Sequence, residues 1–237
     1  MFDATVTDGV LQVSQQATRW LSSGWDGGFH DADAAYNVSV PEGWERTDLI
    51  EYVAERRARA SFETAGPALL TGVDLAHLRG ARDGPVVVYA TAGVSNPAAL
   101  PMEATARGGD GTGAEGDDAT APAGTVNVVA GTGRALADGA LASLLGAVVE
   151  AKTATLLAET GFTGTTTDAA IVGTTTTGEE TEFAGSATEI GASARACVRD
   201  AVRASLASRY ADRGPPASVG DAEHGAVTDR RAEVFTP

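Results

Sequence analysis

The chain contains almost no lysine. Among its 237 residues are 17 basic side chains, of which only Lys152 is a lysine, and 32 acidic residues bring the net charge to −15. Nucleic acids and anionic membranes are polyanions, so a chain this acidic is not expected to bind either of them. Acidic residues spread along a chain that has nearly lost lysine are typical of proteins from a high-salt cytosol, where screening shortens the range of self-repulsion.

Cysteine, aromatic residues and long apolar runs are also scarce. Cys197 is the only cysteine, which excludes an intrachain disulfide and makes a reducing compartment the default. The N-terminal "MFDATVTDGV" lacks the basic and apolar regions of a signal peptide, and no apolar run is expected to reach the ~20 residues that cross a bilayer. These absences predict a soluble, cytoplasmic protein, and they leave a homo-oligomer open.

What is present is an alternation of strand-like and helix-like segments. Periodicity predicts helices over residues 46–63, 136–160 and 186–210, and strands that include "PVVVYATAG" and "GTVNVVAG". We therefore expect one α/β (or α+β) domain over residues 1–210, with a mixed β-sheet of about six to seven strands packed with three main helices. Residues 102–123 are expected to form a flexible acidic Gly-rich loop, and residues 211–237 a polar tail.

The lone lysine falls on the apolar stripe of the second predicted helix. With 100° per residue, Leu141, Leu145, Val148 and Lys152 share one narrow sector, whereas Glu150 points to nearly the opposite side. A lysine on such a stripe can extend its ammonium to the edge of the interface, pair with a buried carboxylate, or be held neutral as a base. Arginine, which serves at every other basic position, does not deprotonate in proteins. This choice favours a chemical role for Lys152.

Several motifs in order resemble one known family. "GTVNVVAG", a helix containing "EAKT" and a following "GTTTDAAIV" are similar to the adenosylcobinamide amidohydrolase family of cobalamin salvage. "LSSGWDGGF", "YNVSVP" and "TAGVSNPA" fit the same order, so the resemblance runs from about residue 21 to residue 206.

The resemblance implies hydrolysis of the amide that joins 1-amino-2-propanol to a propionate side chain of the corrin ring, releasing adenosylcobyric acid. The cobalt then belongs to the corrinoid substrate, and no cofactor or protein metal site is expected. Two departures stand out. Thr166 occupies a glycine-type position of the family's "TGTGTDA", and "AGSATEIG" lacks the His and Lys of "THSKLGE".

Amide hydrolysis needs a nucleophile or activated water, a proton donor for the amine and a stabilised oxyanion. Lys152 and Asp168 are the first candidates, because Asp168 follows a Gly/Thr turn at the mouth of the adjacent strand. Asp168 would orient the ammonium or activate water, and a purely structural ion pair is the alternative. Glu150 of "EAKT" is kept as a further catalytic candidate.

Polar residues at strand ends supply the remaining candidates, since ligand crevices open there in α/β sheets. Ser22 and Ser23 are candidate nucleophiles, Ser95 and Asn96 candidate substrate-binding groups, with Asn96 as an oxyanion donor. For all of these, ordinary turn chemistry is the alternative.

Three further kinds of group are expected to bind substrate. Asn127 would hydrogen-bond a corrin amide, unless it is a satisfied core amide. Thr165 and Thr167 flank backbone N–H groups that could receive the oxyanion. Trp25 would stack on a flat ring together with Trp20 and Trp44, unless the tryptophans only fill an aromatic-poor core.

Other functions are less well supported. "WDGGFHDAD" holds His30 among aspartates, but the chain has three histidines and no HxH or HExxH spacing, so no metal site is predicted. "GTGRAL" has Leu136 where a dinucleotide fingerprint needs a small residue, which excludes NAD binding. A non-catalytic corrinoid carrier remains the alternative from another functional class, and a metal-assisted amidase a weaker one.

Overall fold

The computed structural model describes residues 2–41, 43–102, 124–222 and 224–237. The expected loop over residues 102–123 falls, apart from Met102, outside the described residues. Three α-helices are α1 (Leu49–Arg59), α2 (Asp138–Thr160) and α3 (Glu189–Arg209), and two 3-10 turns are η1 (Leu75–His77) and η2 (Val219–Asp221). A mixed α/β domain with three main helices is thus confirmed.

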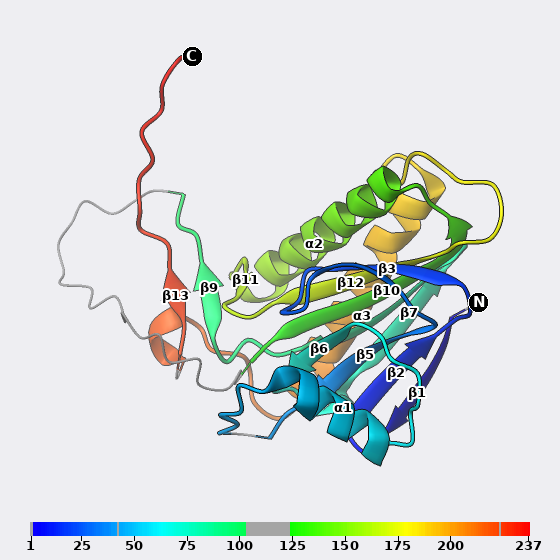
Figure 1. The fold of residues 1–237 in the computed structure, drawn as a ribbon. Helices are drawn as coiled ribbons and strands as arrows, with labels where there is room; N and C mark the ends of the chain where they lie inside the picture. Colours follow the sequence, from blue (N-terminus) through cyan, green and yellow to red (C-terminus); the bar gives the residue numbers. More distant parts are fainter. Residues whose placement is uncertain (1, 42, 103–123, 223) are drawn as a thin grey trace.

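The strands form three sheets rather than one (Figure 1). The largest has six strands in the order β4 (Gly28–Asp31), β3 (Thr18–Ser22), β12 (Ala169–Thr175), β10 (Val126–Ala135), β8 (Val86–Ala92), β7 (Arg79–Asp83). The second has the order β1 (Asp3–Thr7), β2 (Val10–Ser14), β5 (Ala34–Ser39), β6 (Ala68–Thr71). The third, small sheet has the order β11 (Gly164–Thr165), β9 (Pro97–Ala99), β13 (Ala226–Val227).

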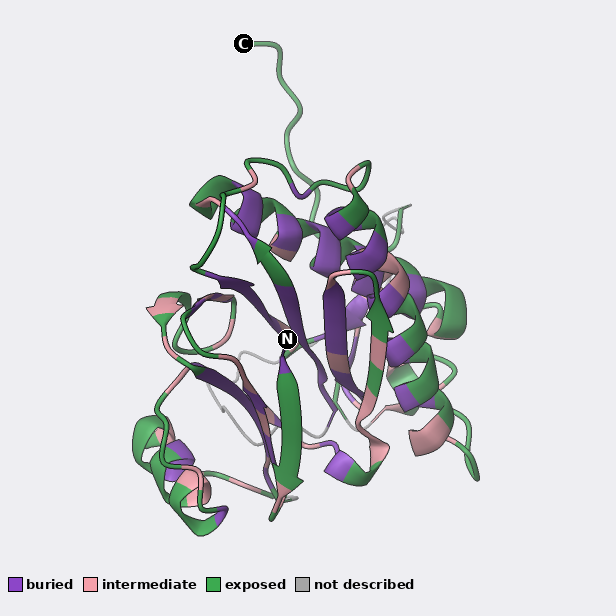
Figure 2. Ribbon diagram, turned by 90° about the vertical axis from the view of Figure 1, so that its right-hand side faces the viewer, coloured by how far each residue is buried: buried purple, intermediate pink, exposed green. Residues whose placement is uncertain are grey.

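These elements stack in four layers: α1, the four-stranded sheet, the six-stranded sheet, and α2 with α3 (Figure 2). Alternation along the strands explains the stacking, because successive side chains point to opposite faces. In β10, Val126 and Val128 pack against the two helices, while Val129 packs between the sheets. Trp20, fully buried, fills the space between the sheets with Phe2.

Helix α2 ends where its sequence predicts, because Gly161 adopts the left-handed conformation with φ 78° that a helix C-cap needs. The helix also corrects one expectation. Over an 18-residue window its mean hydropathy is 1.5, so by length and composition it could cross a membrane. Half of that window is buried inside the fold, as in the core helix of a soluble protein, which makes this weak evidence for a membrane segment.

One edge of the six-stranded sheet gathers the ends of four strands. β10 and β12 run parallel and begin there, while β3 and β8 run antiparallel to them and end there. The small sheet lies at this edge, because β9 follows β8 in the chain and β11 leads through Thr166 to Asp168 into β12. Candidate residues that are far apart in sequence are therefore brought together at one edge.

The C-terminal segment that is predicted to be a polar tail contains one short strand. Ala226 and Val227 form β13, which pairs in parallel with Ala98 and Ala99 of β9, and the N–H of Thr228 donates to the carbonyl of Ala99 at 2.9 Å. Two residues of strand without flanking periodicity leave no sequence signal, because their pairing partner lies far away in the chain. The tail thus supports the small sheet.

Because β13 supports β9, removal of β13 should disturb the edge of the six-stranded sheet at which the candidate residues meet (the site edge). The main core should remain intact. We expect a chain ending at Ala222 to keep cooperative unfolding but to lose activity, and a chain ending at Asp229, which retains β13, to behave as the full-length protein. Thermal unfolding and hydrolysis assays test this pair. Equal activity of both truncated chains would contradict a supporting role for β13.

Cys197 on α3 provides a probe of the folded state. It is 2% exposed, and burial raises the pKa of its thiol to about 11. Because the thiolate is the reactive form, we expect no reaction with a thiol reagent at pH 8 in the folded protein and one equivalent after denaturation. Rapid labelling under conditions that preserve far-UV circular dichroism would contradict this burial.

Candidate active site

The pair predicted from helical phase is present. The Nζ of Lys152 donates a hydrogen bond to Oδ2 of Asp168, and the two side chains are only 8% and 9% exposed. Lys152 reaches the pair from the buried face of α2, beside Leu156 and Val148, and Asp168 stands one residue before β12. The ion pair joins the helix layer to the edge of the six-stranded sheet.

Asp168 has no capacity left for another hydrogen-bond donor. Its Oδ1 accepts from the N–H of Val126 at 2.9 Å and from the hydroxyl of Thr165, and its Oδ2 accepts from the N–H of Thr165 at 3.1 Å as well as from Lys152. A carboxylate offers about four lone-pair positions. All four are used, so Asp168 is placed to orient Lys152 and has no position from which to activate water.

Glycine at position 164 leaves room for this pair. A β-carbon there would lie 2.7 Å from Oδ2 of Asp168 and 3.9 Å from Nζ of Lys152. The first distance is shorter than real contacts of a β-carbon, so any side chain would displace the carboxylate. The glycine of the "GTTTDAA" motif therefore has a steric role at the pair.

The threonines of that motif bond to different partners. Thr165 bonds to Asp168, and Thr166 accepts from Nδ2 of Asn96 at 2.7 Å. Thr167 accepts from the same Nδ2 at 3.3 Å, and its hydroxyl lies 2.9 Å from that of Thr125 and donates to the carbonyl of Gly124 at 3.2 Å. The segment from β11 to β12 is thus bonded to the strands on both sides.

These bonds change the role expected for Asn96. Both threonine hydroxyls occupy its amide nitrogen, so Asn96 is not free to donate to an oxyanion in this arrangement. Its Oδ1 is buried and has no hydrogen-bond partner among the described residues. Asn96 therefore has an unused, buried hydrogen-bond acceptor, whereas the sequence analysis predicts that it acts as a donor.

The two candidate serines point to opposite faces of the sheet. Ser22 is buried, and its hydroxyl accepts from the N–H of Gly24 at 3.1 Å. Ser23 is exposed, and its hydroxyl bonds to the backbone N–H and carbonyl of Ala170 at 3.0 and 3.2 Å. By strand alternation Ser23 shares the face of Asp168, whereas Ser22 shares that of Trp20. Of the two, only Ser23 lies on the helix side with Lys152.

Three other predicted residues do not join the ion pair. Glu150 lies on the opposite side of α2 from Lys152, where its exposed carboxylate pairs with Arg195 of α3. Asn127 is a satisfied donor between the sheets, where its amide donates to Asn37 and to the carbonyl of Leu70. Trp25 is 40% exposed, whereas Trp20 is buried in the core, so the tryptophans form no common platform.

Ser95 is half-buried beside Gly124, at the same edge. A serine that sequence reasoning missed is Ser208 near the end of α3. Its hydroxyl lies 3.0 Å from Nδ1 of His77 and accepts from Arg79 at 2.6 Å. Only the sequence-distant pairing of α3 with η1 and β7 reveals this contact, which ties η1 to the helix end.

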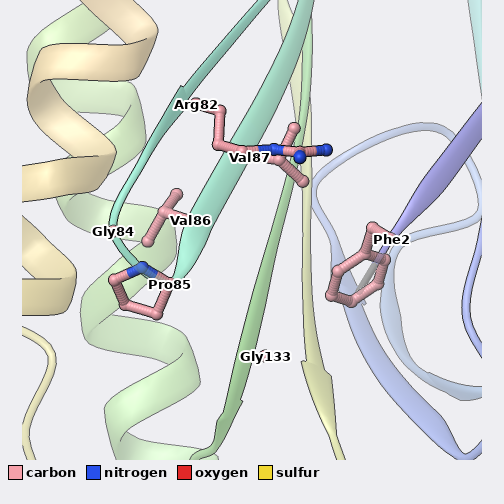
Figure 3. Close-up of a pocket in the computed structure, with 7 residues that line it drawn as sticks. All are labelled: Phe2, Arg82, Gly84, Pro85, Val86, Val87 and Gly133. Atoms are coloured by element: carbon pink, nitrogen blue, oxygen red, sulfur yellow. The ribbon is translucent and has the colours of Figure 1, made fainter.

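Four cavities among the described residues do not include Lys152 or Asp168 in their lining, although one of them is lined by Ala151 and Thr155 of the same helix. A cavity of about 170 Å³ lies between the start of β8 and Phe2, at the opposite end of β8 from the site edge (Figure 3). Arg82 contributes the only charge to its lining. Within the described part of the chain, no group of three or more His, Cys, Asp or Glu side chains could hold a metal ion.

Comparison with known proteins agrees with the motif order. A family model described as adenosylcobinamide amidohydrolase matches residues 2–214. Two curated proteins named adenosylcobinamide amidohydrolase are similar to the chain. The one from Halobacterium salinarum is 52% identical over 239 residues and all of both chains, and the one from Methanosarcina mazei is 30% identical over 80% of this chain and 90% of its own.

The chain belongs to the adenosylcobinamide amidohydrolase family. The family resemblance drawn from the motifs is thereby confirmed, and with it an amide hydrolase. No solved structure matches the chain. In this member of the adenosylcobinamide amidohydrolase family, the motif "GTTTDAA" builds the surroundings of the Lys152–Asp168 pair.

Substitution of Gly164 tests whether the pair matters for this amidohydrolase. We expect Gly164→Ala to reduce kcat strongly while the protein still folds, because the added methyl group displaces the Asp168 carboxylate from Lys152. Gly146→Ala on the exposed face of α2, where a β-carbon meets nothing within 4 Å, is the matched control and should retain full activity. Wild-type kinetics for Gly164→Ala would show that the pair tolerates displacement.

Proposed function

We propose that this chain hydrolyses the aminopropanol amide of adenosylcobinamide to give adenosylcobyric acid. The buried Lys152–Asp168 pair supports the assignment of the reaction to this edge, because hydrogen bonds occupy every acceptor position of the Asp168 carboxylate. A corrinoid is the only partner proposed, its cobalt is part of the substrate, and no further cofactor is proposed. The acidic surface and the scarcity of lysine support a cytoplasmic protein that works in high salt.

Lys152 is assigned the proton transfer. An ammonium has three N–H donors, and Asp168 takes one of them, so the others can face the scissile amide. As water attacks the carbonyl carbon and the C–N bond breaks, Lys152 gives a proton to the leaving amine nitrogen. It regains one from the attacking water, so the products are a carboxylic acid and an amine, and the sum of atoms is that of amide plus water.

Asp168 is assigned a positioning role. Two backbone N–H groups and one hydroxyl hold its carboxylate in place, so the carboxylate in turn fixes the Lys152 ammonium at the sheet edge. The low exposure of both side chains strengthens this attraction relative to a surface pair. A single surface ion pair would be too weak and too mobile to set a reacting geometry.

A proton-transfer role predicts that charge alone cannot replace Lys152. We expect Lys152→Arg to retain the fold and the corrinoid affinity but to lose at least about a hundredfold in kcat, the usual contribution of general acid–base catalysis. Steady-state kinetics and equilibrium binding of adenosylcobinamide in concentrated salt measure both. Near-normal kcat in folded Lys152→Arg would exclude proton transfer by this side chain.

The same assay separates the alternatives. Corrinoid binding by the wild-type protein without release of aminopropanol would identify a carrier, and loss of activity with a chelator would identify a metal-assisted amidase. Ser23→Ala and Ser208→Ala compare the two hydroxyls as nucleophiles. With water as the nucleophile, both variants should keep activity, because their hydroxyls only join elements of the fold.

A further inference from the structure

Helix α2 presents an apolar face to solvent. Nine positions are exposed between Gly139 and Ala158, and among them only Glu150 is charged. The nine are Gly139, Ala142, Ser143, Gly146, Val149, Glu150, Ala154, Leu157 and Ala158. Val149 and Leu157 are 39% and 51% exposed and form a ridge along this face. The other exposed charges of α2 lie at its ends, at Asp138 and Glu159, so the middle of this face carries one charge.

Beside the ridge runs a groove of about 620 Å³ between α2 and α3. Its lining has five alanines, two hydroxyl side chains, one glutamate of α2 and three arginines of α3; these residues are Ala151, Ala154, Ala158, Ala192, Ala196, Thr155, Ser186, Glu159, Arg195, Arg199 and Arg203. Figure 2 shows this helical layer buried toward the sheet and exposed on its outer side. The face therefore carries a ridge and a groove next to each other.

The rim of the groove has no net negative charge. Arg195, Arg199 and Arg203 lie at every fourth position of α3, and each is paired with one carboxylate, respectively Glu150, Asp200 and Glu159. The positive charge of each of these arginines is thus balanced by a carboxylate of the same chain. Two molecules that both carry −15 repel each other least where neither surface has a net negative charge, and the rim of this groove meets that condition.

We propose that a second copy of the chain binds here as a two-fold dimer, in which the Val149–Leu157 ridge of each α2 enters the α2–α3 groove of the other. A two-fold contact uses the same patch on both subunits, which requires a patch that carries both complementary shapes. The ridge and the groove satisfy this requirement. The helix rises about 27 Å from Gly139 to Leu157, so the contact runs along most of α2. As for any reversible dimer, the dimeric fraction depends on the protein concentration.

A membrane is the less suitable occupant of this face. Helices that lie in a bilayer surface are rich in lysine and arginine on their polar side, where they meet anionic headgroups. The polar flanks of α2 instead carry compensated pairs such as Arg195–Glu150 and Arg203–Glu159. The net charge of −15 would repel an anionic surface.

Sedimentation equilibrium of the full chain over a range of concentrations in concentrated potassium chloride tests the proposal. We expect a reversible monomer–dimer equilibrium whose dissociation constant falls as salt is raised, because salt screens the net repulsion and strengthens apolar contact. An interface held by ion pairs would weaken under the same change. A wild-type protein that stays monomeric at every concentration and salt overturns the proposal.

Variants locate the contact. Leu157→Glu and Val149→Glu should each raise the dissociation constant at least about tenfold, while Ile50→Glu on α1, at a position 74% exposed, should leave it unchanged. All three side chains are exposed in the single chain, and circular dichroism together with protection of Cys197 confirms the fold. Equal dissociation constants for all three variants, or flotation of monomeric wild-type protein with phosphatidylcholine vesicles, would overturn the assignment of this face.

Discussion

The site edge depends on the hydrogen bonds that converge on the carboxylate of Asp168. It binds α2 through Lys152, β10 through the N–H of Val126, and β11 through Thr165. A buried carboxylate is tolerated only when it is paired and its lone pairs are satisfied. The same bonds that make its burial tolerable also fix where two strands begin and where a turn of α2 lies. Stability and the position of the reacting ammonium therefore have one cause.

The repetition of threonine in "GTTTDAA" has a physical reason. Each hydroxyl has its own bonds: Thr165 to Asp168, Thr166 to Asn96, and Thr167 to Thr125 and the carbonyl of Gly124. A short segment between two strands has few backbone partners of its own, so side-chain hydroxyls bond it to the strands on either side. The segment becomes rigid where the reaction requires it, and a rigid surrounding shell is what keeps a reacting group within reach of its substrate.

The sequence pattern predicts those features that depend on residues close together in the chain. The helical phase of α2 placed Lys152 on the buried stripe and Glu150 away from it, and the structure confirms both positions. What could not be predicted depends on pairings between distant segments. Arg195, the partner of Glu150, belongs to another helix. Strand β13 pairs with β9, which lies more than a hundred residues earlier in the chain. The division of the strands into separate sheets depends on how whole layers pack. Periodicity contains no information on such partners, and neither does it specify that threonine hydroxyls occupy the amide of Asn96.

The structure also refines the argument from composition. The scarcity of lysine concerns side chains in contact with solvent, where arginine takes its place. Lys152 is only 7% exposed, so a preference for arginine at the surface does not apply to it. What distinguishes lysine here is size as well as proton chemistry. Its ammonium is a compact charge, whereas a guanidinium is a planar fork that needs more room. Glycine at position 164 leaves a limited space beside Nζ, in which a β-carbon would lie in ordinary van der Waals contact at 3.9 Å, and a guanidinium would have to fit into that space. An arginine at position 152 therefore differs from lysine in two respects. Separating them requires corrinoid affinity and turnover to be measured on the same folded variant, because a misfit lowers both and a missing proton donor lowers turnover alone.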